Sequence, residues 1–261
     1  KENIVDPNKI NLEFVIKEFE KEYLAKVNVF GNNITEEKVI RDNLEVDEGD
    51  PFNELLLTKS INNLKSLNIF ADVEYKLTTK DTDKKALNIT VTEKPTGEIF
   101  ASAGTGTQGS TIGFGVKENN FLGKNISLDT NLRLSDETIK GAFSIVNPNW
   151  NYSDKTLIAS IESSVTDRLT DYGYETGKTG ISFGSAWEQY DDVIFSPKIN
   201  SYYEKLDTNQ SATANLKKQE GEYFDTSFSY GLDLDKRNQR FQTSSGYRSR
   251  FSQSIPLISE D

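Results

Sequence analysis

Hydrophobic and polar positions alternate along most of the chain after residue 95. The pattern is clearest in residues 126–134, 156–165, 193–203 and 224–234. Each run lasts about ten residues, the length of a strand that crosses a bilayer at the tilt of a barrel, whereas strands of soluble proteins average nearer six. Turns rich in Gly, Asn and Asp separate the runs. The pattern predicts eight or nine antiparallel strands, and no helix, between Glu98 and Asp261.

Residues 23–95 mix helical and strand patterns instead. Leu24–Phe30 alternates apolar and polar side chains, which predicts a strand, and Gly31-Asn32-Asn33 predicts a turn after it. We expect a short helix next, with Thr35 as its N-cap and acidic side chains at Glu36 and Glu37 in its first turn.

A second helix and two strands complete this segment. Asp50-Pro51 predicts the start of the helix, because aspartate caps helices and proline favours their first turn. The expected apolar stripe of this helix consists of Leu56, Ser60, Leu64 and Leu67. Residues 71–77 and 87–92 are predicted strands, joined by a polar turn over residues 79–85. The order strand, helix, helix, strand, strand predicts an α+β module over residues 23–95.

Residues 1–22 lie outside that module. Ile10–Ile16 alternates like a strand, but the sequence offers it no partner nearby. The simplest interpretation is that residues 1–22 end a preceding module of the same kind, and that the chain is a fragment of a longer protein. Lys1, where an initiator Met would stand, agrees with that interpretation.

Aromatic residues lie near the ends of the predicted strands. They are Phe100, Phe121, Trp150, Tyr152, Trp187, Tyr190, Tyr202, Tyr203 and Tyr223. Transmembrane β-barrels carry aromatic girdles at those depths. A soluble antiparallel sandwich acting as a binding module is the alternative, but strand length and aromatic placement both favour a barrel. The last strand signal runs to the end of the chain with Pro256 in it, so we expect an incomplete barrel over residues 96–261.

Composition excludes much enzyme chemistry. The 261 residues contain no His, Cys or Met. Without His or Cys there is no Ser-His-Asp triad, cysteine nucleophile or thiolate zinc site. The net charge of −11 argues against nucleic acid as a partner. We therefore expect no enzyme, no metal site and no cofactor.

One glycine motif needs a separate interpretation. Residues 104–109 match GxGxxG, but a dinucleotide site requires a helix to begin there, and Ser110–Val116 is strand-like. A tight hairpin is the better prediction. Acidic pairs such as Asp191-Asp192 have too few ligands for a cation site and are expected to lie in solvated turns.

An ordered series of motifs resembles a known family. Residues 27–73 resemble a POTRA module (polypeptide-transport-associated domain) in the Gly31-Asn32 turn, the Glu48–Phe52 sequence and the positions of its apolar residues. Glu93 with Thr96-Gly97 resembles the junction between the last POTRA module and the barrel in the BamA family of outer-membrane protein assembly factors. Further matches to that family's barrel are Gly104–Gly115, Glu118–Gly123, Phe143 with Asn147-Pro148, and Asp235–Asn238 with Thr243 and Gly246. Gln242 departs from the family, which usually has Pro there.

The resemblance implies a function, a location and partners. Members of the family insert other β-barrel proteins into the outer membrane of the Gram-negative cell envelope, with POTRA modules in the periplasm. Implied partners are unfolded outer-membrane proteins, accessory assembly lipoproteins and the lipid bilayer. The family's lipoprotein-contact glutamate corresponds to Glu48, although the same residue could simply be a turn acid before Gly49.

The first barrel strand is the candidate seam, where an incoming strand would pair. The seam residues are Ile99, Phe100, Ala101, Ser102, Ala103, Gly104, Thr105 and Gly106. Gly and Ala pack weakly on a sheet face, so this edge is expected to open easily, although the glycines could equally serve to bend the strand. A secretion pore of the two-partner type, with the same architecture and a dedicated exported partner, is the alternative function.

Overall fold

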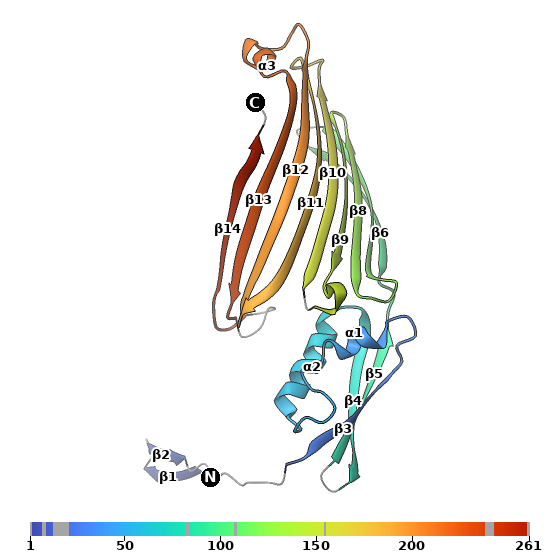
Figure 1. Ribbon diagram of the computed structural model, residues 1–261, viewed down its shortest axis with the longest axis vertical. Helices are drawn as coiled ribbons and strands as arrows, with labels where there is room; N and C mark the ends of the chain where they lie inside the picture. The colour runs from blue at the N-terminus through green and yellow to red at the C-terminus, as the bar shows by residue number, and fades with distance from the viewer. Residues whose placement is uncertain are drawn as a thin grey trace. The chain divides into compact units, whose positions relative to one another are not determined.

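The computed structural model describes residues 2–6, 9–12, 21–81, 84–106, 109–153, 155–237 and 243–259. The chain divides into two compact units, residues 1–94 and residues 95–261. Figure 1 shows helices in the first unit and a large antiparallel sheet in the second.

The first unit has the predicted order of elements. After the hairpin of β1 (Glu2–Asp6) and β2 (Lys9–Leu12) come β3 (Tyr23–Phe30), α1 (Glu37–Arg41), α2 (Glu54–Ser66), β4 (Phe70–Asp81) and β5 (Lys84–Glu93). The three-stranded sheet has the order β3-β5-β4, with β3 parallel and β4 antiparallel to β5. The strand expected from Ile10 has a partner after all, because β2 pairs with β1. Residues 13–16 of that predicted strand lie outside the described residues.

A compact apolar core holds this unit together. Helix α2 buries Leu57, Ile61 and Leu64 against the sheet residues Leu24 and Leu87. Gly31 permits the tight turn after β3, since it has φ +86° and a Cβ there would lie 2.0 Å from the carbonyl oxygen of Val91.

Ser60 is buried in the middle of the apolar stripe of α2. Its hydroxyl donates to the Leu56 carbonyl (2.8 Å) and accepts from the Glu45 N–H (2.7 Å). Both hydrogen bonds compensate the burial of a polar group. Of the predicted stripe, Ser60 and Leu64 are buried and Leu67 packs against the core, whereas Leu56 is 39% exposed and Leu57 is buried in its place.

Both predicted helix caps were wrong. Helix α1 has Glu36 at its N-cap position, and Thr35 is buried. Helix α2 begins after Asn53, whose side chain accepts from the N–H groups of Leu55 (2.9 Å) and Leu56 (3.4 Å). Pro51 instead forms a β-bridge with Tyr23. The Asp50-Pro51 signal therefore marks a connection to β3.

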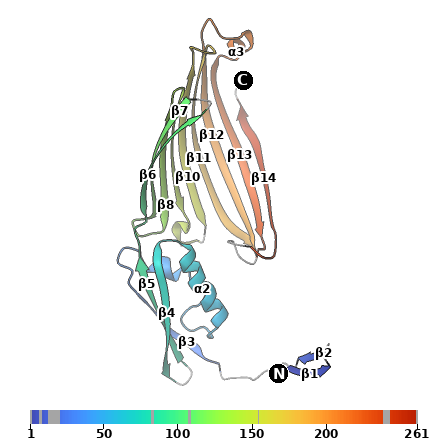
Figure 2. The same ribbon diagram turned by 180° about the vertical axis from the view of Figure 1, so that it is seen from behind.

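Nine strands form the sheet of the second unit, in agreement with the predicted eight or nine. They are β6 (Gly97–Gly106), β7 (Gly109–Phe121), β8 (Ile126–Ser135), β9 (Thr138–Asn147), β10 (Thr156–Arg168), β11 (Tyr174–Tyr190), β12 (Val193–Thr208), β13 (Gly221–Asp235) and β14 (Arg248–Ser259). Each strand pairs antiparallel with the next, and Figure 2 shows β6 and β14 at opposite ends of this row. The strands form one sheet and not two stacked sheets, so the sandwich alternative was wrong.

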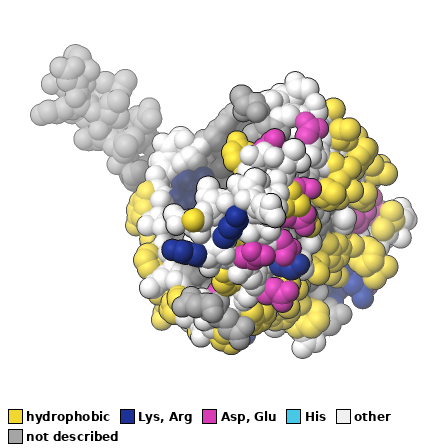
Figure 3. Space-filling model, turned by 90° about the horizontal axis from the view of Figure 1, so that it is seen from above, with side chains coloured by type: hydrophobic (Ala, Val, Ile, Leu, Met, Phe, Trp, Pro, Cys, Tyr) yellow, Lys and Arg dark blue, Asp and Glu magenta, His cyan; other side chains and the backbone are white. Residues whose placement is uncertain are grey.

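The cross-strand register separates two faces. One row across the middle contains Lys117, Asp129, Ser144, Ser160, Ser182 and Asn200, and defines the polar face. The neighbouring row contains Val116, Thr130, Phe143, Ile161 and Ile181, and defines the apolar face. Figure 3, which looks onto the end that carries α3 (Ala214–Lys218), shows charged side chains across the middle of the view and hydrophobic ones along its edge.

Hydroxyl groups on the apolar face pair with each other. Ser163 and Thr179 lie opposite each other with 2.9 Å between their hydroxyl oxygens, and Ser201 and Thr226 lie 3.0 Å apart. Pairing matters on such a face, because an unpaired polar group in hydrocarbon costs several kcal/mol.

The prediction of aromatic girdles was only partly right. Trp187, Tyr190 and Tyr203 belong to the apolar face, and Trp187 packs edge-on against Phe195 at 5.2 Å. Phe100, Tyr202 and Tyr223 fall on the polar face by register. A girdle residue must have the right parity along its strand as well as the right depth.

Two short helices correct the expectation that none follows residue 95. These are α3, between β12 and β13, and the 3₁₀ turn η1 (Trp150–Tyr152). Among the described residues, no helix has the length and hydrophobicity needed to cross a membrane. The GxGxxG segment is a hairpin as predicted: Gly106 ends β6 and Gly109 begins β7, while Thr107 and Gln108 lie outside the described residues.

Candidate functional site

All eight candidate seam residues lie in β6, at one end of the sheet. The strand pairs with β7 along its whole length, from Gly97 opposite Glu118 to Gly106 opposite Gly109. Within the described residues β6 has no strand on its other side, and every residue of β6 is exposed. The other edge of β6 is therefore a ten-residue row of backbone groups open to a further strand.

Side-chain packing contributes little to the pairing of β6 with β7. Ala101 and Ala103 face Phe114 and Ile112 on the apolar face, and small side chains bury little area there. Phe100 is the exception: its ring lies over Gly115 on the polar face, where a Cβ would come within 1.9 Å of the ring. Hydrogen bonds and one aromatic contact thus hold most of β6 in place.

The opposite end of the sheet is built differently. Strand β14 carries large apolar side chains, and the Phe251 ring lies 6.1 Å from that of Tyr230 on β13. Asp233 of β13 accepts hydrogen bonds from both Arg248 and Arg250 of β14. In the nearby Asp235–Asn238 motif, Asp235 binds Arg237 through two contacts of 2.7 Å. Asn238 and Gln242 lie outside the described residues.

Glu48 lies in the loop that covers one edge of the first unit's sheet. Its carboxylate accepts the Val27 N–H of β3 at 3.0 Å and lies 3.7 Å from the Arg41 guanidinium. Arg41 also donates to the Val27 carbonyl (2.9 Å), and Gly49 N–H donates to the Leu24 carbonyl (2.7 Å). Glu48 therefore has a structural role, although 47% of its side chain remains exposed.

The structure gives Glu93 a role that sequence reasoning missed. Its carboxylate accepts the N–H groups of Asn33 (2.9 Å), Ile34 (2.9 Å) and Thr35 (2.6 Å). Burial alone would raise the pKa of Glu93, but these hydrogen bonds and one from the Thr35 hydroxyl outweigh it and lower that pKa below its ordinary value. Thr35, the expected N-cap, instead donates hydrogen bonds to this carboxylate.

A second glutamate holds the chain on the other side of Pro95. Glu118 accepts a hydrogen bond from the Thr96 hydroxyl (2.5 Å) and one from the Asn120 N–H (2.7 Å). Lys94 is fixed in turn, through its ammonium group to the Asn68 side chain (2.6 Å). The residues quoted for the junction resemblance, Glu93 and Thr96, are thus both hydrogen-bonded within their own units.

Two family models match the chain. The Omp85 superfamily domain matches residues 120–260, which is 141 of the 261 residues. The POTRA family, described as a surface antigen variable number repeat, matches residues 22–94. One match lies within each unit.

The curated relatives that this chain matches are BamA proteins. The outer membrane protein assembly factor BamA of Neisseria meningitidis is 26% identical over 182 residues, covering 66% of this chain and 23% of that protein. BamA of Nitratidesulfovibrio vulgaris is 26% identical over 218 residues, covering 82% of this chain and 27% of that protein. The chain thus spans about a quarter of the length of these two relatives.

Solved structures share the fold. BamA from Haemophilus ducreyi lacking POTRA domains 1–3 superposes with a TM-score of 0.71 at 18% identity, covering 98% of this chain and 52% of that one. CdiB from Escherichia coli gives 0.57 at 11% identity, covering 91% and 46%. At such identities the likeness concerns the fold alone. With the family models and the relatives, it confirms the predicted resemblance to BamA. The chain therefore belongs to the Omp85 superfamily, and it is an outer-membrane protein whose POTRA module lies in the periplasm.

Proposed function

We propose that this chain is part of a factor that assembles β-barrel proteins in the outer membrane, and that incoming substrate strands pair with the free edge of β6. The observation that carries the proposal is the contrast within β6: a complete ladder to β7 on one side, and no strand among the described residues on the other. The names of the curated relatives support assembly as the function.

Physical chemistry favours pairing at this edge. Unpaired backbone groups facing hydrocarbon cost several kcal/mol each, so an open edge in a bilayer attracts any strand that can pair with it. An unfolded barrel protein supplies such strands, and adding one to an exposed edge is β-augmentation. The small side chains of β6 leave room for a substrate strand, and they make few contacts with any strand of the protein itself that would compete for the same edge.

Cysteine cross-linking in the full-length protein tests the proposal. The 261 residues contain no Cys, so single cysteines at Ile99, Ala101, Ala103 and Thr105 each give a thiol that is unique within this part of the protein, on the apolar face of β6. We expect these thiols to form disulfides with cysteines in strands of a substrate during its assembly. The matched controls are Ile161, Ser163 and Val165, which share that face but lie in β10, a strand paired on both sides. Equal trapping at β6 and β10, or none at β6, would refute the proposal.

The POTRA module has its own candidate contacts. Its β3 edge is covered by residues 48–50, whereas β4 has no strand beyond it among the described residues. We propose that β4 receives unfolded substrate by β-augmentation, and that the exposed part of Glu48 contacts an accessory lipoprotein. Both contacts are proposals that rest on exposure and on the likeness to BamA.

Two substitutions separate the roles of Glu48. Glu48→Gln keeps an oxygen that can accept the Val27 N–H but removes the charge, and Glu48→Lys removes both. If the charge contacts a lipoprotein, both variants should weaken its co-purification with the full-length protein, Glu48→Lys more strongly. If the lipoprotein still co-purifies with both variants, Glu48 has only its structural role in the loop. Circular dichroism of both variants shows whether the module remains folded.

A secretion pore of the two-partner type remains the second candidate, because it would have the same architecture of POTRA module and antiparallel sheet. The cross-linking experiment separates the two candidates. A dedicated exported partner would pass along the polar face, so thiols on the apolar face of β6 would not capture it.

A further inference from the structure

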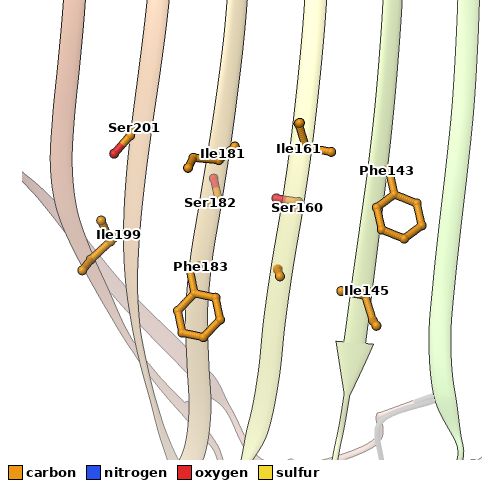
Figure 4. Close-up of a pocket in the computed structure, with 10 residues that line it drawn as sticks. Phe143, Ile145, Ser160, Ile161, Ile181, Ser182, Phe183, Ile199 and Ser201 are labelled. Carbon is orange, nitrogen blue, oxygen red and sulfur yellow. The ribbon is translucent and has the colours of Figure 1, made fainter.

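The apolar face of the sheet contains a hollow in its central part. The hollow has a volume of about 380 Å³ and is bounded by residues of β9 to β12. Figure 4 shows Phe143, Ile145, Ile161 and Phe183 standing around it. Its size falls within the range of pockets that hold small molecules, roughly 300–1,000 Å³.

A single small side chain creates this hollow. Ala159 lies between Ile145 and Phe183 in one cross-strand row. Its neighbour along β10 in the next apolar row, Ile161, is flanked by bulky side chains as well. Large apolar side chains therefore form the rim, and the floor is low at Ala159 because its side chain is a single methyl group.

The lining selects hydrocarbon. No Lys, Arg, Asp or Glu lines the hollow, and the one hydroxyl on its apolar side, that of Ser201, is already paired with Thr226. The side chains of Ser160 and Ser182 belong to the polar face, where Ser182 is hydrogen-bonded to Asn200. A polar ligand or a lipid headgroup would find no partner here, whereas an alkyl chain needs none.

The position of the hollow sets its depth in the membrane. Ile199, on its rim, lies four residues from Phe195 and four from Tyr203 along β12. Both aromatic side chains belong to the apolar face, and Lys205, the next residue of that face beyond Tyr203, is charged. At about 3.3 Å per residue and a tilt near 40°, each aromatic lies roughly 10 Å in depth from the hollow. The β12 rim of the hollow is thus near the bilayer midplane, where acyl chains end.

We propose that this hollow is a lipid site, which takes the terminal part of one acyl chain of a membrane phospholipid. The occupant follows from continuity, because the hollow opens in a face that meets lipid throughout and lies at the depth of chain ends. Contact with several bulky side chains would hold an acyl chain there longer than on the smoother parts of the same face. The site is independent of the proposed function of β6.

Photolabelling tests this site in the full-length protein. The protein is reconstituted in phosphatidylcholine vesicles containing a little phospholipid with a diazirine near the end of one acyl chain, irradiated, and mapped by peptide mass spectrometry. We expect several-fold more adducts on residues around Ala159 than around Phe114 and Leu132, which share the face outside the hollow. A diazirine near the carboxyl group should lose that preference, because it lies at a shallower depth.

Filling the hollow provides the decisive control. Ala159→Phe should abolish the preference, whereas Leu134→Phe, on the same face in β8 and outside the hollow, should leave it unchanged. Heat-modifiable gel mobility confirms folding, and Ala159→Leu replaces the larger change if Ala159→Phe fails to fold. Even labelling over the whole face, or a preference that survives filling, would overturn the proposal.

Discussion

The two units use hydrophobic side chains in opposite ways. In the POTRA unit they point inward, and thirteen apolar residues form a buried cluster around α2 and the sheet. In the sheet unit the large apolar side chains point outward: Phe143, Ile161 and Phe183 are all at least 40% exposed. Of the described residues of that unit, Ala212, in the loop before α3, is the one buried apolar residue. The apolar side chains of the first unit are buried in its own core, whereas those of the second are removed from water only when a bilayer surrounds the sheet.

This difference explains why the same alternating pattern gives different structures. A strand of the POTRA unit alternates so that one side meets the core, and β4 and β5 have 12 and 10 residues. A strand of the second unit alternates over 10 to 17 residues because it must span hydrocarbon. The strand lengths of the two units overlap, so the lipid environment is marked instead by the unbroken series of nine antiparallel strands with exposed large apolar side chains.

The strongest test of the comparison places a charge on each face of one strand. Ile161 and Ser160 are neighbours in β10 with opposite orientations. Ile161→Arg puts a guanidinium against lipid near the midplane, where it costs about 2–4 kcal/mol, whereas Ser160→Arg puts it on the polar face. Urea unfolding of the full-length protein in vesicles measures both. We expect a large loss for Ile161→Arg and a change within about 0.5 kcal/mol for Ser160→Arg.

Similar losses for both variants would mean that the two faces do not differ in environment, and the assignment of lipid to the apolar face would fail. A larger loss at Ser160 would reverse the assignment. Gel mobility before and after heating reports independently whether each variant still folds into the membrane.

The sequence predicted the fold far better than the local contacts. Strand positions, the number of strands and the POTRA order followed from periodicity, because period and length are properties of a single segment. The helix caps did not follow, since Thr35 is recruited by Glu93, 58 residues away in sequence. Nor did the face of Phe100 and Tyr202, because the parity of a strand depends on its register with its neighbours.

The candidate site shows the same limit. Gly and Ala in residues 99–106 indicated a weakly packed strand, and the structure places all of them at one end of the sheet. That Phe100 rests on Gly115 was not predictable, because a glycine under an aromatic ring has no signal of its own in one sequence. The resemblance to the family singled out Glu48 in the sequence, but the hydrogen bond that its carboxylate accepts from the Val27 N–H could not be predicted. Contacts between distant segments require the fold.

A smaller effect is expected where the POTRA unit depends on a polar contact and not on its core. Glu93→Ala leaves three backbone N–H groups without their acceptor, and that of Thr35 is buried, since Thr35 is only 2% exposed. One unsatisfied buried donor costs about 1–3 kcal/mol. Glu93→Gln keeps one acceptor oxygen and should lose less. Urea unfolding of residues 21–94, followed by circular dichroism, measures both. Losses as large as that of Ile161→Arg would show that this unit relies on its polar contacts as much as on its core.

The same carboxylate predicts how the POTRA unit responds to pH. The pKa of Glu93 is lower in the folded unit than its ordinary value of 4.5, so the ionised form is favoured by folding. Its contribution to the free energy of unfolding is complete above pH 4.5 and is lost as pH falls through the lower, folded pKa. The difference in stability between the original unit and Glu93→Gln should therefore be constant near neutral pH and shrink below pH 4.5. A difference that grows on acidification would mean that folding raises this pKa, and that burial outweighs the hydrogen bonds from residues 33–35.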